Sequence, residues 1–232
     1  MQLYNTLTKK VRNMKIRREF KIVIENLKKN NINAIFCETK ADALKTVEAM
    51  LEKGASISTG GSVSLVESGV WELINNGDYV FRNRLRDGIT PEEQQQVFKD
   101  IIGIDYYLCS ANAVTKNGDI LNVDGFSNRI SAIAFGPKKV IMVVGKNKIV
   151  DTLDDAFLRV KKVAAPKNCV RLGIDNPCAK LGHCISLEKC DNPDFTDGCK
   201  SARRICVNYL VNGFQRDNGR LNVILCGQDL GY

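Results

Sequence analysis

The spacing of hydrophobic residues predicts alternating helices and strands through most of the chain. Spacings of three and four indicate helices, which we expect over 3–30, 41–52, 63–74, 130–135 and 153–163. Short apolar or alternating runs indicate strands, which we expect over 33–37, 55–59, 79–81, 105–109, 120–123, 139–144 and 221–226. This alternation is typical of an α/β domain, so we predict a mostly parallel sheet with covering helices.

Local signals define several boundaries. The run Thr90-Pro91-Glu92-Glu93 predicts a helix start, and Ser64 and Glu67 also have capping-box spacing. An Asn-Gly turn at 116–119 predicts a β-hairpin into the strand at 120–123. Regular periodicity is lost over 166–215, which we interpret as a loop-rich insert. We therefore divide the chain into a basic helical arm, an α/β core, and a Cys-rich segment with a final strand that joins the sheet, at 1–30, 31–165 and 166–232.

The turn after the strand at 55–59 is a candidate anion site. It contains Gly60, Gly61 and Ser62 and leads directly into a helix. The first N–H groups of a helix are free, and the helix dipole adds partial positive charge there. Glycine lets the backbone approach a phosphate or carboxylate closely. The alternative is a tight turn that only lets the strand and helix pack. The chain contains neither G-x-G-x-x-G nor G-x-x-x-x-G-K-[ST], which argues against a dinucleotide fingerprint and a P-loop.

Polar segments follow four of the predicted strands, at 59–62, 112–115, 124–129 and 145–148. The carboxyl ends of parallel strands meet at one edge of a sheet, and ligands bind there in open α/β sheets. We therefore expect these four segments to surround one cleft.

The segment at 124–129 combines the carboxylate of Asp124, the amide of Asn128 and the guanidinium of Arg129. Arg129 suits a carboxylate or phosphate, which a guanidinium binds through two parallel hydrogen bonds. Asp124 suits acid–base chemistry or a metal ion. The alternative is a turn in which Asp124 and Asn128 bond to the local backbone and Ser127 caps a helix. Lys148 is a further candidate for anion binding, or else a solvated lysine.

Composition and charge exclude several classes of protein. Hydrophobic residues make up 44% of the chain and charged residues 26%, as in ordinary globular proteins. No apolar run approaches the roughly 20 residues that span a bilayer, and the first residues contain no apolar signal segment. We therefore expect no membrane span and a cytoplasmic location. Most of the net charge of +8 lies in residues 1–30, which carry nine basic and two acidic side chains. This arm lacks the aromatic platforms of nucleic-acid-binding proteins, so we favour a solvated helix face over a nucleic-acid or membrane contact.

Six of the nine cysteines lie within residues 169–206. An odd number in a chain of this size does not suit a secreted disulfide scaffold, and clustered thiols in a reducing cytosol indicate metal or iron–sulfur ligation. The spacing matches neither a zinc ribbon nor a ferredoxin, and separately buried thiols or redox pairing are the alternatives. A four-Cys site with one left over is available from Cys178, Cys184, Cys190, Cys199 and Cys206. Three more cysteines lie in predicted strands and are expected to be small core residues, namely Cys37, Cys109 and Cys226.

Three stretches resemble the lactate-utilisation (LUD) domain family of the YkgG type. They are ISTGGSVSLVESGVWELI, the run over 111–150, and the tail with Pro177-Cys178 and Arg204-Ile205-Cys206. The resemblance covers residues 10–232 and implies a fold like those of ribose-phosphate isomerases and coenzyme A transferases. It also implies a role near lactate oxidation, where relatives accompany an iron–sulfur redox protein. Matched by position, the ligand-site candidates are Gly60, Gly61, Ser62, Asn128 and Lys148, with Asp124 and Arg129 as the catalytic candidates.

The family's cysteine pattern is matched by Cys178, Cys184 and Cys206. With Cys190 they form the predicted ligand set for a [4Fe–4S] cluster or zinc. The family has two cysteines close together, whereas five residues separate Cys184 from Cys190, and 191–200 looks like an insertion that brings Cys199. The fourth ligand is therefore open between Cys190 and Cys199.

Three functional hypotheses follow. The first is a LUD-family protein that binds lactate or a related small anion between Gly60–Ser62 and Asp124–Arg129 and works with an iron–sulfur redox partner. The second is a non-catalytic assembly subunit of a redox complex, docked through its basic arm. The third is a stand-alone isomerase or acyl transferase. A covalent coenzyme A transferase needs a Glu after a strand, and Glu67 lies inside a predicted helix, so we rank the third hypothesis last. A homo-oligomer is compatible with all three.

Overall fold

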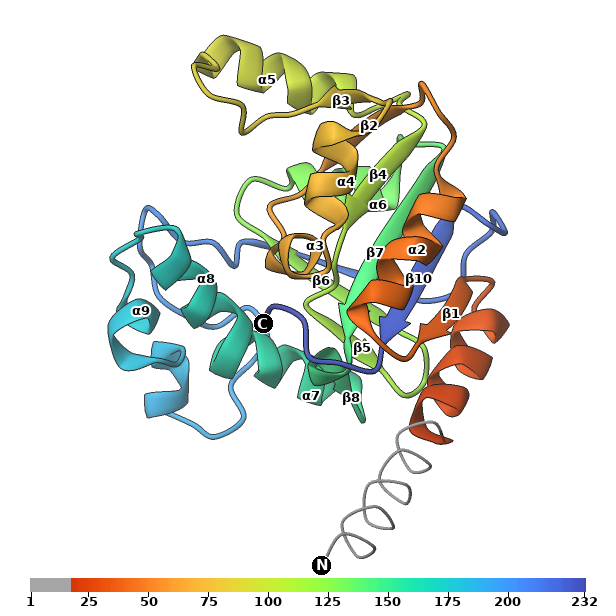
Figure 1. Ribbon diagram of the computed structural model, residues 1–232. Coiled ribbons are helices and arrows are strands. Elements are labelled where there is room, and N and C mark those ends of the chain that lie inside the picture. Colours follow the sequence, from red (N-terminus) through yellow and green to blue (C-terminus); the bar gives the residue numbers. More distant parts are fainter. Residues whose placement is uncertain (1–17) are drawn as a thin grey trace, which may run out of the picture.

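A six-stranded parallel sheet forms the centre of the molecule (Figure 1), which we describe over residues 18–232 of a computed structural model. The strand order is β1-β10-β7-β4-β2-β3, and every neighbouring pair is parallel. The strands are β1 (Asn33–Cys37), β2 (Ser56–Thr59), β3 (Val80–Arg82), β4 (Tyr106–Cys109), β7 (Lys139–Gly145) and β10 (Leu221–Cys226). The predicted α/β class is therefore confirmed, and the final strand joins the sheet between β1 and β7.

Helices cover both faces of this sheet, which explains the uninterrupted hydrophobic runs of β7 and β10. Along β7, Val140, Met142 and Val144 belong to the core on one face, while Ile141 and Val143 belong to the core on the other. Strands buried on both faces do not alternate between apolar and polar residues. The first face is covered by helical residues 18–29 and α6 (Asn128–Ala134), and the second by α2 (Lys40–Met50), α3 (Val63–Glu67) and α4 (Val70–Asn76).

A second, four-stranded sheet lies beside the first, in the order β8-β5-β6-β9. The Asn-Gly turn at 116–119 joins β5 and β6 as the predicted antiparallel hairpin. Gly118 has φ +87°, and a Cβ there would lie 2.7 Å from the Asn26 carbonyl carbon. The strand β9 was not predicted. It lies in the segment that we interpreted as a loop-rich insert, and it is only partly buried. The strands are β5 (Ala113–Thr115), β6 (Ile120–Asp124), β8 (Ile149–Val150) and β9 (Asn208–Asn212).

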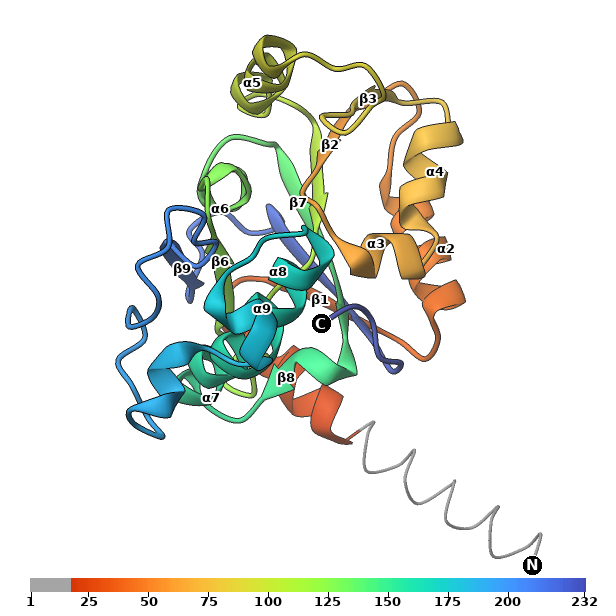
Figure 2. The same ribbon diagram turned by 90° about the vertical axis from the view of Figure 1, so that its left-hand side faces the viewer.

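One helical stretch runs from Leu153 to Arg171, so the predicted end at 163 is wrong. It consists of α7 (Leu153–Arg159), a π-helical turn (Val160–Ala164) and α8 (Ala165–Arg171). Pro166 lies in the first turn of α8 after the π-helical turn, where its missing N–H is tolerated. Figure 2 shows α7, α8 and α9 (Pro177–Leu181) on the opposite side of the central sheet from α2 and α4.

Two predicted helix starts have different outcomes. The capping box at Thr90 and Glu93 is confirmed at the start of α5 (Pro91–Asp100). The capping pair Ser64 and Glu67 is wrong, because α3 begins two residues earlier than that pair requires, with Ser62 as its N-cap. Residues 3–17 of the predicted basic arm lie outside the described residues.

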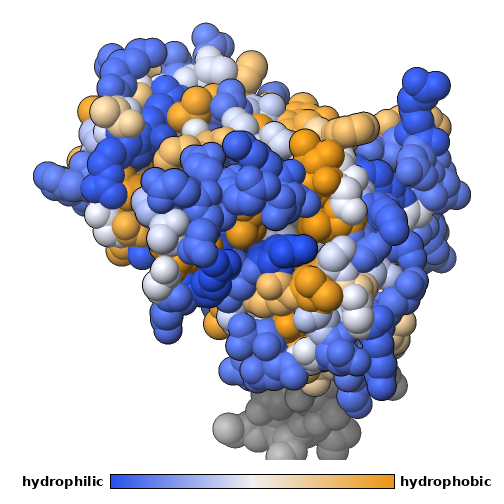
Figure 3. Space-filling view, turned by 90° about the horizontal axis from the view of Figure 1, so that it is seen from above, coloured by the Kyte–Doolittle hydropathy of each residue, from blue (hydrophilic) through white to orange (hydrophobic). Residues whose placement is uncertain are grey.

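Within residues 18–232, no helix combines the length and the apolar character that crossing a bilayer requires. The face seen in Figure 3 is mostly hydrophilic, with hydrophobic side chains exposed in small groups between the polar ones.

Candidate functional site

Loops that follow β2, β4, β6 and β7 surround one pocket with a volume of about 320 Å³. The expectation that the polar segments meet is therefore confirmed. Gly60 lies directly behind the pocket, since a Cβ on it would approach the Arg129 Cδ at 3.2 Å. The other sequence candidates all line the wall, namely Gly61, Ser62, Asp124, Asn128, Arg129 and Lys148.

Gly61 allows two guanidinium groups to approach the turn. A Cβ at this position would lie 3.1 Å from Nη2 of Arg84 and 3.6 Å from Nη2 of Arg171. Arg84 comes from the loop after β3 and Arg171 from the last turn of α8. Any side chain at Gly61 would therefore occupy the space in front of these two cations.

Arg84 and Arg171 were not among the sequence candidates, although the loop at 82–88 is visibly basic. Within the described part of the chain, no carboxylate forms an ion pair with either. The Arg84 Nε is buried without a hydrogen-bond partner, and its guanidinium lies 5.7 Å from the Phe98 ring centre. Burial lowers the pKa of Arg84, and the positive charge of Arg171 lowers it slightly further. An anion between the two groups would compensate both effects.

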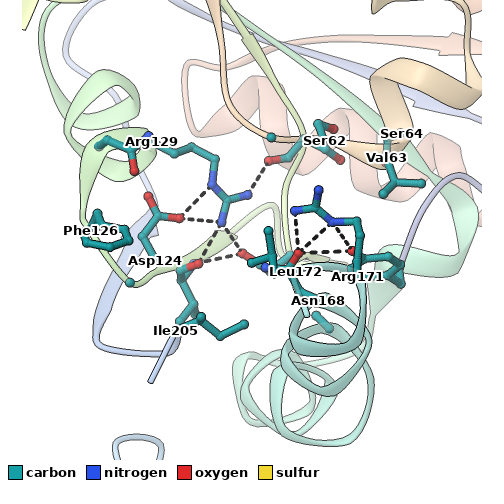
Figure 4. A pocket seen from close by; sticks show the side chains of 18 of the residues that line it. Ser62, Val63, Ser64, Asp124, Phe126, Arg129, Asn168, Arg171, Leu172 and Ile205 are labelled. Atoms are coloured by element: carbon teal, nitrogen blue, oxygen red, sulfur yellow. Dashed lines mark hydrogen bonds and ion pairs between the residues drawn. The ribbon is translucent and has the colours of Figure 1, made fainter. Parts of the chain in front are cut away.

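Arg171 is oriented by its neighbours rather than neutralised by them. Its Nε donates hydrogen bonds to the Asn168 Oδ1 at 3.1 Å and to the Tyr232 hydroxyl at 2.7 Å. Asn147 holds the segment that carries Tyr232, because its amide donates to the Gly231 carbonyl and accepts from the Leu230 N–H. Figure 4 shows Arg171 reaching from α8 toward Ser62 and Val63.

Asp124 and Arg129 form a buried ion pair on the other side of the pocket (Figure 4), with 2.8 Å between Arg129 Nη2 and Asp124 Oδ1. Arg129 also donates to the Ser110 carbonyl, the Asn112 Oδ1 and the Val123 carbonyl. The second carboxylate oxygen of Asp124 accepts the Ile130 N–H at 2.9 Å, at the start of α6. Both charges are thus engaged within the protein. The bond from the Ile130 N–H is of the kind expected if Asp124 serves the local backbone, and Ser127 is the N-cap of α6 but makes no side-chain capping bond.

Lys148 is buried at the inner end of the pocket. Its Nζ donates hydrogen bonds to the Ser64 Oγ at 2.9 Å and the Ser110 Oγ at 3.1 Å. Burial lowers the pKa of Lys148 to about 7, and the positive charges of Arg159 and Arg129 act in the same direction. Its amine is therefore a group in this pocket whose charge changes near neutral pH.

The pocket wall has a strong excess of positive charge. Among the described residues of the wall, the only side-chain carboxylate is that of Asp124, which Arg129 already neutralises. Over residues 18–232, Arg84, Arg171 and Lys148 form no ion pair with a carboxylate. The wall therefore suits an anionic ligand on chemical grounds.

A second, small cavity of about 20 Å³ lies in the Cys-rich segment. Cys178, Cys184, Cys199 and Cys206 line it, whereas Cys190 is exposed elsewhere. The Sγ atoms of Cys169 and Cys178 are 3.6 Å apart, and burial raises the pKa of Cys178 to about 12. Across residues 18–232, no three His, Cys, Asp or Glu side chains converge closely enough to hold a metal ion.

The remaining cysteines agree with their predicted role. All nine are free thiols. Cys37, Cys109 and Cys226 are buried in the strands of the central sheet, as predicted. His183, the only histidine, pairs with Glu188 on the surface.

Comparisons with known proteins identify the family. The family model of the LUD domain matches residues 20–226. No curated protein matches the chain. One similar solved structure is a DUF162 family protein from Deinococcus radiodurans, with 15% identity and a TM-score of 0.49 over 92% of this chain and 98% of that one. Another is ribose 5-phosphate isomerase A from Methanocaldococcus jannaschii, with 12% identity and a TM-score of 0.34 over 77% and 80%. The structural similarities are too low to carry an argument, but the family match spans most of the sequence and confirms the resemblance seen there: this chain belongs to the LUD domain family.

Proposed function

We propose that this LUD-domain protein binds a small organic anion in the 320 Å³ pocket and serves a role related to lactate utilisation. Membership of the family supports the metabolic role. The observation that supports the binding most directly is the pair of guanidinium groups, Arg84 and Arg171, which converge on Gly61 and form no ion pair with any carboxylate of residues 18–232. Two like charges held this close are costly unless an anion joins them.

In this proposal the carboxylate or phosphate of the ligand accepts hydrogen bonds from Arg84 and Arg171 in front of the Gly60–Ser62 turn. Lys148 lines the same pocket, next to Ser64 and Ser110. Depending on pH, its amine exchanges a proton with the ligand or adds a positive charge. Asp124 and Arg129 act as a positioning pair, because their mutual ion pair and backbone contacts hold the start of α6 and the pocket wall in place.

The test is anion binding by calorimetry and thermal shift, with phosphate, lactate and pyruvate as probes. A ligand present at one hundred times its Kd stabilises the folded state by about 2.7 kcal/mol. We expect Arg84→Gln and Arg171→Gln each to weaken binding about 10- to 100-fold, since a charge-assisted hydrogen bond contributes about 1.5–3 kcal/mol.

Arg86→Gln is the matched control. Arg86 lies in the same loop as Arg84 but pairs with Glu93 on the surface at 2.8 Å. Its replacement should leave anion affinity unchanged. If Arg84→Gln binds every probe as tightly as the wild type, or if none of the probes binds, the proposal is wrong.

A second candidate function rests on the four thiols that share the small cavity. The donor set suits zinc or an iron–sulfur cluster chemically. The fit is incomplete, because the sulfurs do not converge on one point in this arrangement. A cavity of about 20 Å³ holds little more than one water-sized body, so this packing suits a single ion better than a [4Fe–4S] cluster. We therefore propose a single metal ion here, with Cys199 in place of Cys190.

Metal analysis after anaerobic purification tests this second proposal. Cys199→Ser should abolish bound zinc or iron, whereas Cys190→Ser, which changes an exposed thiol outside the cavity, should leave it unchanged. Metal-free wild-type protein that also fails to take up Zn²⁺ would remove the proposal.

A further inference from the structure

We propose that the anion bound in the pocket is amphipathic: an organic phosphate or carboxylate that carries an apolar chain or ring larger than the body of lactate. This proposal rests on the proposed anion-binding function and specifies the class of ligand. Two features of the pocket carry it, namely its size and the apolar residues of its wall, among them the exposed Phe126.

The size of the pocket exceeds what a three-carbon acid needs. Its volume of about 320 Å³ falls in the range of about 300–1,000 Å³ that is typical of sites for drug-sized ligands. A lactate ion at the guanidinium pair would leave most of this space to water. A ligand that fills the pocket must therefore extend well beyond its anionic group.

Charged and apolar side chains share the wall of the pocket. Arg84 and Arg171 face the Gly61 turn, and the guanidinium of Arg84 lies over the Phe98 ring. Figure 4 shows Phe126 and Ile205 across the pocket from Ser62. The apolar part of the wall includes Phe98, Phe126, Leu172, Ile174 and Ile205.

Phe126 presents most of its ring to solvent. It lines the pocket and yet is 92% exposed. Its loop is held in place on both sides: Asp124 pairs with Arg129, and a Cβ on Gly125 would lie 3.2 Å from the Ile205 Cα. A ligand that covers the Phe126 ring removes apolar surface from water, which favours its binding. An apolar chain or ring between Phe126 and Leu172 would do this.

A homologous series of probes tests the proposal by calorimetry. The series consists of inorganic, methyl, butyl and hexyl phosphate, with acetate, butanoate and hexanoate as the matched carboxylates. We expect affinity to rise about two- to fourfold for each added methylene, which is the gain from burying one CH₂ group. The comparison of the two arms identifies the preferred anionic group.

Two variants separate the two ends of the ligand. Phe126→Ser should weaken hexyl phosphate about tenfold and leave inorganic phosphate within twofold of the wild type. Phe135→Ser is the matched control, because Phe135 is also an exposed phenylalanine, at 74%, but lies outside the pocket. Arg84→Gln should instead weaken every member of the series by a similar factor.

The outcomes distinguish this inference from the function on which it rests. If inorganic phosphate or acetate binds and longer chains add no affinity, the amphipathic ligand is refuted while anion binding stands. The same holds if Phe126→Ser leaves the gain per methylene unchanged. If no member of either series binds, both proposals fail together.

Discussion

Replacing Arg129 with Met tests whether the Asp124–Arg129 pair supports the fold. The variant leaves the Asp124 carboxylate with only the Ile130 N–H, in a side chain that is 8% exposed. It also removes the donors for three backbone and side-chain oxygens. Breaking a buried ion pair from one side costs about 3–5 kcal/mol. Arg129 is 16% exposed, so we expect a loss near the lower end, about 3 kcal/mol.

For a chain of this length, about 3 kcal/mol corresponds to a fall in Tm of roughly 6–12 °C. Urea unfolding followed by circular dichroism measures the free energy, and calorimetry measures Tm. The double variant Asp124→Asn/Arg129→Met should recover at least half of the loss, because the unpaired charge is gone while the amide oxygen still accepts the Ile130 N–H. Lys138→Met is the control for an exposed pair, since Lys138 is 73% exposed where it bonds to Asp105, and it should cost less than about 1 kcal/mol. A loss below about 1 kcal/mol for Arg129→Met would refute the supporting role.

Three further predictions concern the charges of the pocket. In the folded state the pKa of Lys148 is lowered from 10.5 to about 7, so between these values the unfolded chain binds more protons. The free energy of unfolding of the wild type, measured against Lys148→Met, should therefore rise from pH 7 toward pH 9.5 by up to about 1.4 kcal/mol per pH unit, and a flat difference would show that Lys148 stays protonated. Arg84→Met should leave the Tm of the ligand-free protein unchanged or raise it by a few degrees, because it removes a partly buried cation that pairs with no carboxylate in the described part of the chain; a clear decrease would mean that Arg84 supports the fold. Gly61→Ala should weaken phosphate binding while the Tm changes by less than about 2 °C, because the new methyl group displaces only the flexible ends of Arg84 and Arg171; unchanged affinity in calorimetry would contradict this geometry.

The sequence predicts the central sheet well because its signals are local. The strand at 221–226 has the predicted bounds, and the strand at 139–144 differs by one residue. Strands that are buried on both faces are apolar throughout, so a continuous apolar run in the sequence marks the position of each such strand. The Thr90 capping box and the Asn-Gly hairpin are also short-range patterns, and both are confirmed.

Elements that depend on distant contacts were missed. The strand β9 has only one buried residue, and it is a strand through its pairing with β6. The helix continues through Pro166 because a π-helical turn places the proline where no N–H is needed. No local pattern in the sequence indicates either outcome.

The candidate site likewise combines residues that the sequence predicted with residues that only the fold brings together. The residue types at the ends of β2, β4 and β7 identified the edge of the central sheet where the pocket lies, because parallel strands end on one side. Asp124 and Arg129 follow β6, which is an antiparallel strand of the second sheet, so only the tertiary structure brings them to this edge. Arg84 and Arg171 are 87 positions apart in the chain, and only the packing of α8 against the turn after β2 brings their guanidinium groups to Gly61. The pairing of charges also depends on the tertiary structure. The sequence shows that Asp124 and Arg129 are near in the chain, but the fold decides that they neutralise each other rather than a ligand.

Hydrophobic periodicity and turn chemistry thus determined the fold class, the central strands and the position of the cleft, since each follows from neighbours within a few residues. The composition of the pocket was decided by the tertiary structure. Long side chains from four separate segments line one pocket there, and which of them remains without an ion-pair partner depends on the others.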